Sequence, residues 1–280
     1  MSEASAVPVT LAVGARTDTG RKRAGNEDSY LAVAPAFVVA DGMGGHDAGD
    51  RASVAVVAAF RSKVPEGPRT SIDAVRTALA LADTEVSRLA ASTARGAGST
   101  VAGVALIEHE GLPCWLVFNV GDSRVYRQLG TDLQQITVDH SLGQELVDGG
   151  SLRPDQLRDF AQRNVITRAI GAADSAADSW LLPVTTGERL LICSDGLTGE
   201  VSDEAIRATL TMTGRAESAA DALVKRALDA GGRDNVTVVV IDVVAGGSPA
   251  VGEEPTGERL GAPSTESTID ATTLPVRVVR

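Results

Sequence analysis

The stretch FVVADGMGGHDAGDRAS, residues 37–53, shows how this chain folds, because an apolar run ends there on Asp41 and is followed at once by Gly42. Asp-Gly pairs are typical of tight turns between strands, and this pair alone indicates no more than a hairpin. The pattern returns in LLICSDGL, residues 190–197, where a second apolar run ends on Asp195. Two tight turns could still explain the two Asp-Gly pairs.

The composition predicts a globular protein of one large or two small domains. The chain has 280 residues, 43% of them hydrophobic, which is enough for a sizeable core. A formal net charge of -11, with no basic cluster interleaved with aromatics, argues against a nonspecific nucleic-acid binder. No segment has the pattern of a leader or a membrane span, so we expect a cytoplasmic protein with no membrane partner. Cys114 and Cys193 lie in apolar runs and are expected to be buried and reduced.

Predicted strands and helices come in blocks and do not alternate strictly, which favours an α+β fold with antiparallel sheets and helices on their outer faces. Strands are expected at 9–17, 29–34, 36–41, within 99–128, at 190–194 and at 235–244. Helices are expected at 48–62, 71–92, 202–213 and 216–230. Residues 1–9 form a lead-in, 10–244 a single domain, and 245–280 a Gly/Pro/Ser/Thr-rich tail that is expected to be disordered.

Acidic residues gather at the ends of the predicted strands. They are Glu27, Asp28, Asp41, Asp122, Asp195 and Asp234, the last followed by Asn235. If these ends converge, the carboxylates would repel one another unless a cation held them. Oxygen donors without cysteine or paired histidine favour Mg²⁺ or Mn²⁺ over Zn²⁺, and the Gly42 carbonyl is a further candidate ligand. Two such ions can bind a phosphate and acidify a water between them.

A basic segment precedes the first acidic pair. Arg21, Lys22 and Arg23 could orient a phosphate, and a solvated surface turn explains the same residues equally well.

Taken together, these motifs resemble the metal-dependent Ser/Thr protein phosphatases of the PPM (type 2C) family in its bacterial form. The resemblance covers the predicted domain and rests on an ordered set: GRKRAGNEDSY (20–30), VADGMGGHDAGDRAS (39–53), GAGSTVAGVAL (96–106), VGDSRVYR (120–127), TVDHS (137–141), RNVITRAIG (163–171), LLICSDGL (190–197) and GGRDNVTVVV (231–240). It implies a β-sandwich flanked by helices, with two metal ions at one edge and a flap at 141–164 beside the catalytic cleft.

The resemblance also implies a role for each candidate residue. Asp41 would bridge the two core ions, the Gly42 carbonyl would bind one of them, and Asp195 and Asp234 would complete the set. Asp122 would help to hold a third ion, Glu27 and Asp28 would bind or orient metal-bound water, Asn235 would lie beside the metal edge, and Arg23 would bind the substrate phosphate. His140 is expected to anchor the flap.

His46 is the least defined candidate, since it could either protonate the leaving serine or threonine oxygen or form a structural hydrogen bond. The leading hypothesis is a monomeric phosphatase that acts through a metal-activated water on proteins phosphorylated by Ser/Thr kinases. A metal-binding phosphoprotein reader without turnover and a phosphatase for small phosphate esters are the alternatives.

Overall fold

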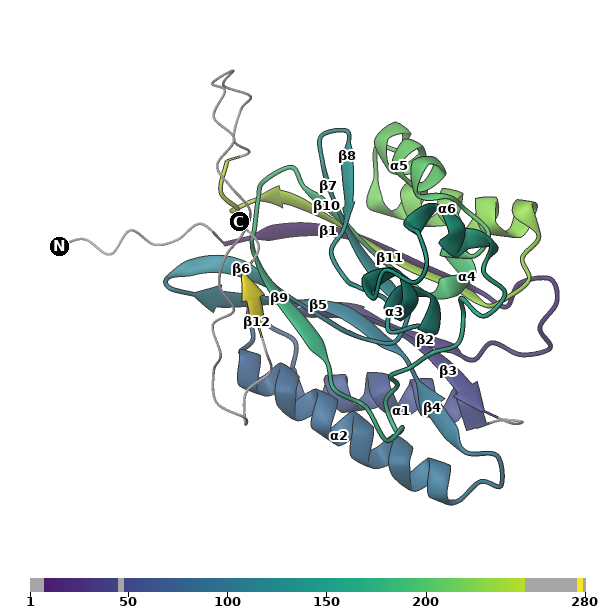
Figure 1. Ribbon diagram of the computed structural model, residues 1–280. Coiled ribbons are helices and arrows are strands. Elements are labelled where there is room, and N and C mark those ends of the chain that lie inside the picture. Colours follow the sequence, from purple (N-terminus) through teal and green to yellow (C-terminus); the bar gives the residue numbers. More distant parts are fainter. Residues whose placement is uncertain (1–7, 45–47, 250–275, 279–280) are drawn as a thin grey trace.

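The protein folds into two β-sheets that lie face to face, with helices on the outer face of each (Figure 1). The structure is a computed structural model that describes residues 8–44, 48–249 and 276–278. One sheet has five strands, in the order β1 (Thr10–Asp18), β11 (Val236–Ala245), β10 (Arg189–Cys193), β7 (Arg124–Leu129) and β8 (Asp132–Gln135). The other runs β12 (Val276–Val278), β9 (Asp178–Pro183), β6 (Leu112–Val120), β5 (Val101–His109), β3 (Ala36–Gly44) and β2 (Asp28–Val33), with β4 (Ala97–Ser99) paired to β3. All pairings are antiparallel except that of β12 with β9.

Apolar side chains from both sheets fill the space between them. Successive residues of a strand point to opposite faces, so one set of side chains from each strand enters this layer. Phe37, Trp115 and Ile241 are fully buried there, and the rings of Phe37 and Trp115 meet edge to face with their centroids 6.4 Å apart. Burial of one such side chain contributes about 2 to 3 kcal/mol. This layer fixes how far apart the strand ends of the two sheets lie.

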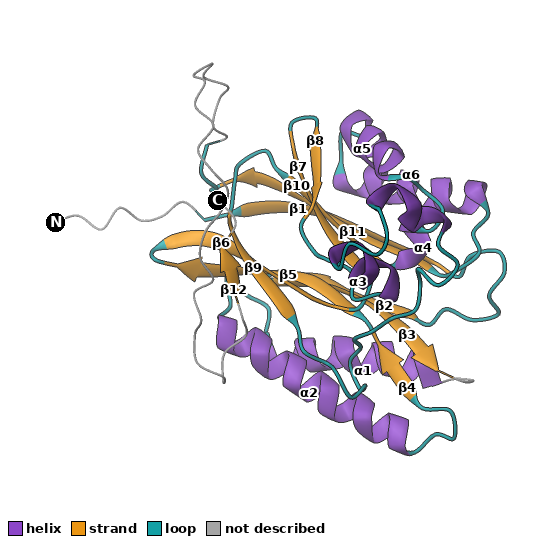
Figure 2. Ribbon diagram, in the orientation of Figure 1, coloured by secondary structure: helices purple, strands orange, loops and turns teal. Residues whose placement is uncertain are grey.

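Helices cover both outer faces, as Figure 2 shows. Two of them, α1 (Ala48–Lys63) and α2 (Ile72–Ala91), pack on the seven-stranded sheet, where Phe60 stacks on Phe118 with ring centroids 5.1 Å apart. The five-stranded sheet is covered by α5 (Asp203–Met212) and α6 (Ala216–Ala230), and the short helix α4 (Asp195–Thr198) follows β10. The predicted antiparallel sandwich with helices on both outer faces is confirmed.

The predicted helices are confirmed with shifts of one residue at some ends. The helix expected at 71–92 is α2, and its predicted apolar stripe, including Val75, Leu79 and Val86, is buried. It begins after Ser71, whose hydroxyl accepts a hydrogen bond of 3.1 Å from the N–H of Ala74. Such a cap satisfies one of the N–H groups that the first helical turn leaves without a partner.

Four strands were not predicted: β8, β9, β12 and β4, of which only Ser99 falls in the range expected to hold strands. Four consecutive residues of β9 are buried, so its short apolar run has no alternation that separates a strand from other buried segments. Strand β12 lies in the tail that was expected to be disordered, and for residues 276–278 this expectation is wrong. Residues 250–275 and 279–280 of that tail lie outside the described ranges. Among the described helices, none has both the length and the apolar character needed to cross a bilayer.

Candidate metal centre

The predicted carboxylates come together where strands of the two sheets end. Asp28 opens β2 and Asp41 lies near the end of β3, where the antiparallel register makes the two residues partners. Asp122 follows β6, and Asp195 follows β10 with only Ser194 between them. Burial, and then the charges of Asp28, Asp195, Asp122 and Asp234, raise the pKa of Asp41, so these four acids lie within electrostatic reach of Asp41. Asp234 lies just before β11.

Burial and mutual repulsion hold these carboxyl groups in a state that disfavours ionisation. Burial, and then the charges of Asp195 and Asp234, raise the pKa of Asp28 to about 7. Burial, followed by the charge of Asp234, raises the pKa of Asp195 to about 6. The pKa values of Asp41 and Asp122 lie well above the ordinary range, again chiefly because of burial. A bound cation would relieve this repulsion and favour the charged form of each group.

Three of these carboxylates each have a buried oxygen without a hydrogen-bond partner. The atoms are Oδ1 of Asp28, Oδ1 of Asp122 and Oδ1 of Asp195. The other oxygen of Asp28 accepts a hydrogen bond of 2.8 Å from the hydroxyl of Ser194. A buried carboxylate oxygen without a partner costs free energy unless a proton donor or a metal ion satisfies it. The three oxygens therefore fit a site for a cation.

Gly42 occupies a position that no larger residue could take. A Cβ at Gly42 would lie 2.0 Å from the carbonyl oxygen of Gly49 and 2.7 Å from that of Glu27. A Cβ at Gly49, in turn, would lie 2.9 Å from the Gly42 carbonyl oxygen and 2.7 Å from Oε1 of Glu27. The Gly42 carbonyl and the Glu27 carboxylate therefore face the same narrow space, as two ligands of one site or of its water would.

In the basic segment that precedes Glu27, the Arg23 side chain reaches these carboxylates. Its Nη2 donates to Oδ2 of Asp234 over 2.7 Å, and 49% of its side chain remains exposed. Arg21 lies apart from them, because its side chain donates to the carbonyl of Leu228 and pairs with Asp229. Within the described part of the chain, Arg23 is therefore the one of these two arginines that contacts the carboxylates at the strand ends.

Asn235 ties the segment of Arg23 and Glu27 to the segment of Asp234. Its Oδ1 accepts a hydrogen bond of 2.8 Å from the N–H of Glu27. Its Nδ2 donates to the carbonyls of Thr19 and Gly25, each over 2.9 Å. The side chain is buried, so these bonds fix the loop without competition from water.

As the described side chains stand, no three His, Cys, Asp or Glu groups are close enough to hold a metal ion together. Asp234 gives one oxygen to Arg23 and the other to the N–H of Asn235, which donates over 2.8 Å. Hard divalent cations also take carbonyl and water ligands, so each ion needs fewer than three carboxylates. The donor set, the unpartnered oxygens and the space at Gly42 together suit Mg²⁺ or Mn²⁺.

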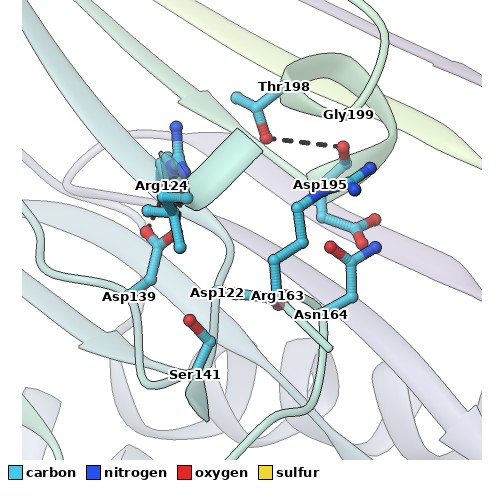
Figure 3. Close-up of a pocket in the computed structure, with 10 residues that line it drawn as sticks. Asp122, Arg124, Asp139, Ser141, Arg163, Asn164, Asp195, Thr198 and Gly199 are labelled. Atoms are coloured by element: carbon cyan, nitrogen blue, oxygen red, sulfur yellow. Dashed lines mark hydrogen bonds and ion pairs between the residues drawn. The ribbon is translucent and has the colours of Figure 1, made fainter. Parts of the chain in front are cut away.

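A small cavity of about 70 Å³ lies between these acids and the predicted flap (Figure 3). Asp122 and Asp195 line it, as do Arg163 and Asn164 from the end of the flap, which contains α3 (Leu142–Asp148) and the 3-10 helix η1 (Pro154–Asp159). Arg124 and Asp139 also line it, and Arg124 donates to both carboxylate oxygens of Asp139, from Nε to Oδ1 over 2.9 Å and from Nη2 to Oδ2 over 2.7 Å. The cavity has room for water or an ion beside two carboxylates that carry unpartnered oxygens.

His140 anchors the flap to the metal edge, as the sequence predicts. Its Nδ1 accepts a hydrogen bond of 3.1 Å from the N–H of Gly121, and its own N–H donates to the Gly121 carbonyl over 3.0 Å. Its carbonyl accepts from the N–H of Thr167, on the other side of the flap, over 2.9 Å. Both ends of the flap are therefore attached to the turn that carries Asp122.

The sequence also matches a known family over most of its length. A family model described as Protein phosphatase 2C matches residues 21–230. The chain belongs to the protein phosphatase 2C family. The matched range contains Arg23, Asp41 and Asp195 and ends four residues before Asp234.

The chain matches about half of one member of the protein phosphatase 2C family and nearly all of another. It is 39% identical over 243 residues to the serine/threonine protein phosphatase PstP of Mycobacterium tuberculosis, a match that covers 85% of this chain and 46% of PstP. The chain thus spans about half the length of that relative. It is 33% identical over 238 residues to the protein phosphatase PhpP of Streptococcus pneumoniae, covering 81% of this chain and 95% of PhpP.

Solved structures of the protein phosphatase 2C family share the fold. The serine/threonine phosphatase PstP/Ppp of Mycobacterium tuberculosis matches with a TM-score of 0.78 and 34% identity, over 84% of this chain and 99% of that chain. The catalytic domain of PstP in complex with two manganese ions matches with a TM-score of 0.76 and 33% identity, over 85% of this chain and all of that chain.

His46 falls in residues 45–47, outside the described ranges, so its position stays untested. Ser194 was not singled out from the sequence, although its hydroxyl donates to Asp28 and accepts from the N–H of Thr237 over 3.0 Å. Its place directly before Asp195 was the signal that could have found it.

Proposed function

We propose that this protein is a metal-dependent phosphatase that hydrolyses phosphoserine and phosphothreonine on other proteins, with two Mn²⁺ or Mg²⁺ ions. The observation that carries the proposal is the group of carboxylates around Asp41, which includes three buried oxygens without partners and has Arg23 at its rim. Membership of the protein phosphatase 2C family supports the reaction, and the names of PstP and PhpP support proteins as substrates.

The chain offers a set of oxygen ligands for the ions. Asp41 would lie between the two core ions, with the Gly42 carbonyl, Asp195 and Asp234 completing the set, Asp122 beside a third ion, and Glu27 and Asp28 orienting water. Bound divalent ions supply a water of lowered pKa and positive charge for the phosphate. The buried environment of Asp28 and Asp122 strengthens their attraction to any cation that enters.

Arg23 would bind the substrate phosphate. A guanidinium presents parallel N–H groups that match two phosphate oxygens. Asp234 holds the Arg23 side chain at the metal edge, and half of that side chain stays accessible to a substrate. Arg23 therefore contacts the cluster of carboxylates and is also accessible from the solvent, from which a phosphoprotein would approach.

His46 is proposed as the group that returns a proton to the leaving serine or threonine oxygen. Its pKa range suits this role, and it lies five residues after Asp41 in the sequence. A structural hydrogen bond is the competing role, and His46→Gln separates the two: loss of the alkaline limb of the kcat profile, where a proton donor would be deprotonated, supports the proton donor.

Phosphate release from a phosphothreonine peptide tests the proposed function. The metal-stripped protein is assayed with and without Mn²⁺, beside Asp41→Asn, Asp234→Asn and the control Asp73→Asn. Asp73 lies at the start of α2 with 79% of its side chain exposed. Asp73→Asn therefore removes one negative charge, as the other two variants do, and leaves the centre intact. We expect Mn²⁺-dependent release by the wild type and the control, and losses of at least about 100-fold in the two centre variants.

Two results would overturn this assignment. One is binding of the phosphopeptide at saturating Mn²⁺ without any release of phosphate, which would indicate a phosphoprotein reader. The other is release from nucleotides or small phosphate esters with none from phosphopeptides, which would indicate a small-molecule phosphatase.

We further propose a phosphatase domain at residues 10–244 of a cytoplasmic monomer that opposes Ser/Thr kinases in bacterial signalling. Cys114 and Cys193 are both free and buried, which suits a reducing compartment. Light scattering on the purified protein tests the monomer, and a phosphoproteome measured with and without the protein tests its substrates.

A further inference from the structure

Glu200 and Arg233 form an ion pair in which the carboxylate is buried and the guanidinium is exposed. The Glu200 side chain is only 4% exposed, whereas that of Arg233 is 71% exposed. Oε1 of Glu200 accepts from Nε of Arg233 over 2.8 Å and from its backbone N–H over 3.0 Å, and Oε2 accepts from Nη2 over 2.9 Å. The carboxylate thus holds the backbone of Arg233 as well as its side chain.

The turn around Arg233 is shaped to this carboxylate. Gly231 and Gly232 have φ values of 150° and 55°, which side chains rarely adopt. A Cβ at Gly231 would lie 3.1 Å from Oε1 of Glu200. The chain therefore wraps closely around Glu200 in the residues that lead directly into Asp234.

Glu200 also belongs to the segment that carries Asp195. The N–H of Gly199 donates to the Asp195 carbonyl over 2.7 Å, and the N–H of Glu200 donates to the Leu197 carbonyl over 3.2 Å. One compact turn thus presents Asp195 at its start and Glu200 at its end. Because Glu200 accepts hydrogen bonds from Arg233, this turn is joined to the segment of Asp234, which lies more than thirty residues later in the sequence.

The same turn supports the segment of Arg23. The carbonyl of Gly232 accepts from the N–H of Arg21 over 2.7 Å. A Cβ at Gly20 would lie 2.1 Å from the Asp234 carbonyl, so the two segments are in close contact. A shift of the turn at Gly232 would consequently be passed to Arg23 as well as to Asp234.

We propose that Glu200 is a positioning residue, which acts through Arg233 to fix Asp234 and Arg23 relative to Asp195. This inference rests on the proposed metal centre and extends it to a residue that touches neither metal nor substrate. Replacement of groups that orient metal ligands commonly lowers metal affinity 10-fold to 100-fold. We therefore expect about a 10-fold loss of Mn²⁺ affinity when the Glu200–Arg233 contact is broken.

The test measures Mn²⁺ binding by calorimetry on the metal-stripped full chain. Glu200→Gln keeps the shape of the side chain but turns an N–H₂ group toward the guanidinium, and Arg233→Ala removes the partner. Glu204→Gln is the matched control, because Glu204 forms a similar two-oxygen ion pair with Arg207 on α5, with bonds of 2.9 and 2.6 Å. Thermal unfolding in chelator checks that all variants are folded.

Kinetics with a phosphothreonine peptide separate positioning from general stability. At saturating Mn²⁺ we expect kcat of Glu200→Gln to return to within about twofold of wild type, while KM stays raised several-fold because Arg23 has moved. The double variant should bind Mn²⁺ no more weakly than the weaker single variant, since both changes break one contact.

Each failure has its own meaning. If wild type and Glu204→Gln bind Mn²⁺ and Glu200→Gln binds it equally tightly with unchanged KM, Glu200 has no positioning role. If the folded wild type binds no Mn²⁺, the proposed metal centre itself is wrong. Additive losses in the double variant would show that the two residues act separately, which also overturns the inference.

Discussion

Replacing Asp28 by Asn should stabilise the metal-free protein at neutral pH. Burial and neighbouring charges raise the pKa of Asp28 to about 7 from an ordinary value of 3.8. Because its folded pKa is raised, the folded state holds this proton more tightly than the unfolded chain, so the contribution is full below pH 4 and is lost as the pH rises through 7. About three pH units at roughly 1.4 kcal/mol each give a loss of about 4 kcal/mol. Asn cannot ionise and still accepts the hydrogen bond of the Ser194 hydroxyl.

Urea unfolding in chelator measures this effect between pH 5 and 7.5. Over that range the free energy of unfolding of the wild type should fall by about 2 to 3 kcal/mol more than that of Asp28→Asn. For a urea slope near 3 kcal/mol/M this moves the unfolding midpoints apart by about 1 M. Saturating Mn²⁺ should remove or reverse the difference, since the ion competes with the proton. Parallel pH curves for the two proteins in chelator would refute the electrostatic reasoning.

Three further predictions concern other parts of the centre. Arg23→Lys, which loses the planar fork, should raise KM for a phosphopeptide about 10-fold in steady-state assays, and an unchanged KM would exclude a two-point contact between Arg23 and the phosphate. Gly42→Ala should lower the unfolding free energy by at least about 2 kcal/mol because its Cβ would overlap the Gly49 carbonyl, whereas Gly67→Ala, with no atom closer than 4.0 Å, should not, as measured by thermal unfolding. His140→Asn, which can keep the bond to the Gly121 N–H, should protect flap amides from hydrogen exchange better than His140→Ala, and equal exchange in both would contradict the anchor.

The fold class and the cluster of carboxylates could be predicted because each depends on a pattern of neighbouring residues in the sequence. An apolar run that ends on Asp41 or Asp195 marks both a strand and its end, and the sandwich brings such ends together. The stripe of α2 and its Ser71 cap likewise depend only on nearby residues. Strand β9 has no such mark, because it is buried between neighbours and lacks alternation.

The partners of the carboxylates could not be predicted from the sequence. Ser194 binds Asp28 and Glu200 binds Arg233 only because distant segments meet in the folded chain. The pairing of Arg23 with Asp234 also depends on the loop that Asn235 holds in place. These contacts join residues far apart in the sequence, and spacing within one motif does not reveal them.

The most direct test of the proposed centre is a count of the Mn²⁺ ions that the metal-stripped protein binds. Calorimetric titration of the wild type should show two core sites per chain, with any third ion bound more weakly. Asp41→Asn should lose both core sites, because Asp41 is the carboxylate that we propose the two ions share, while the exposed control Asp73→Asn should bind as the wild type does. A wild type that binds no Mn²⁺, or an Asp41→Asn variant that binds the same number of ions equally tightly, would contradict the assignment.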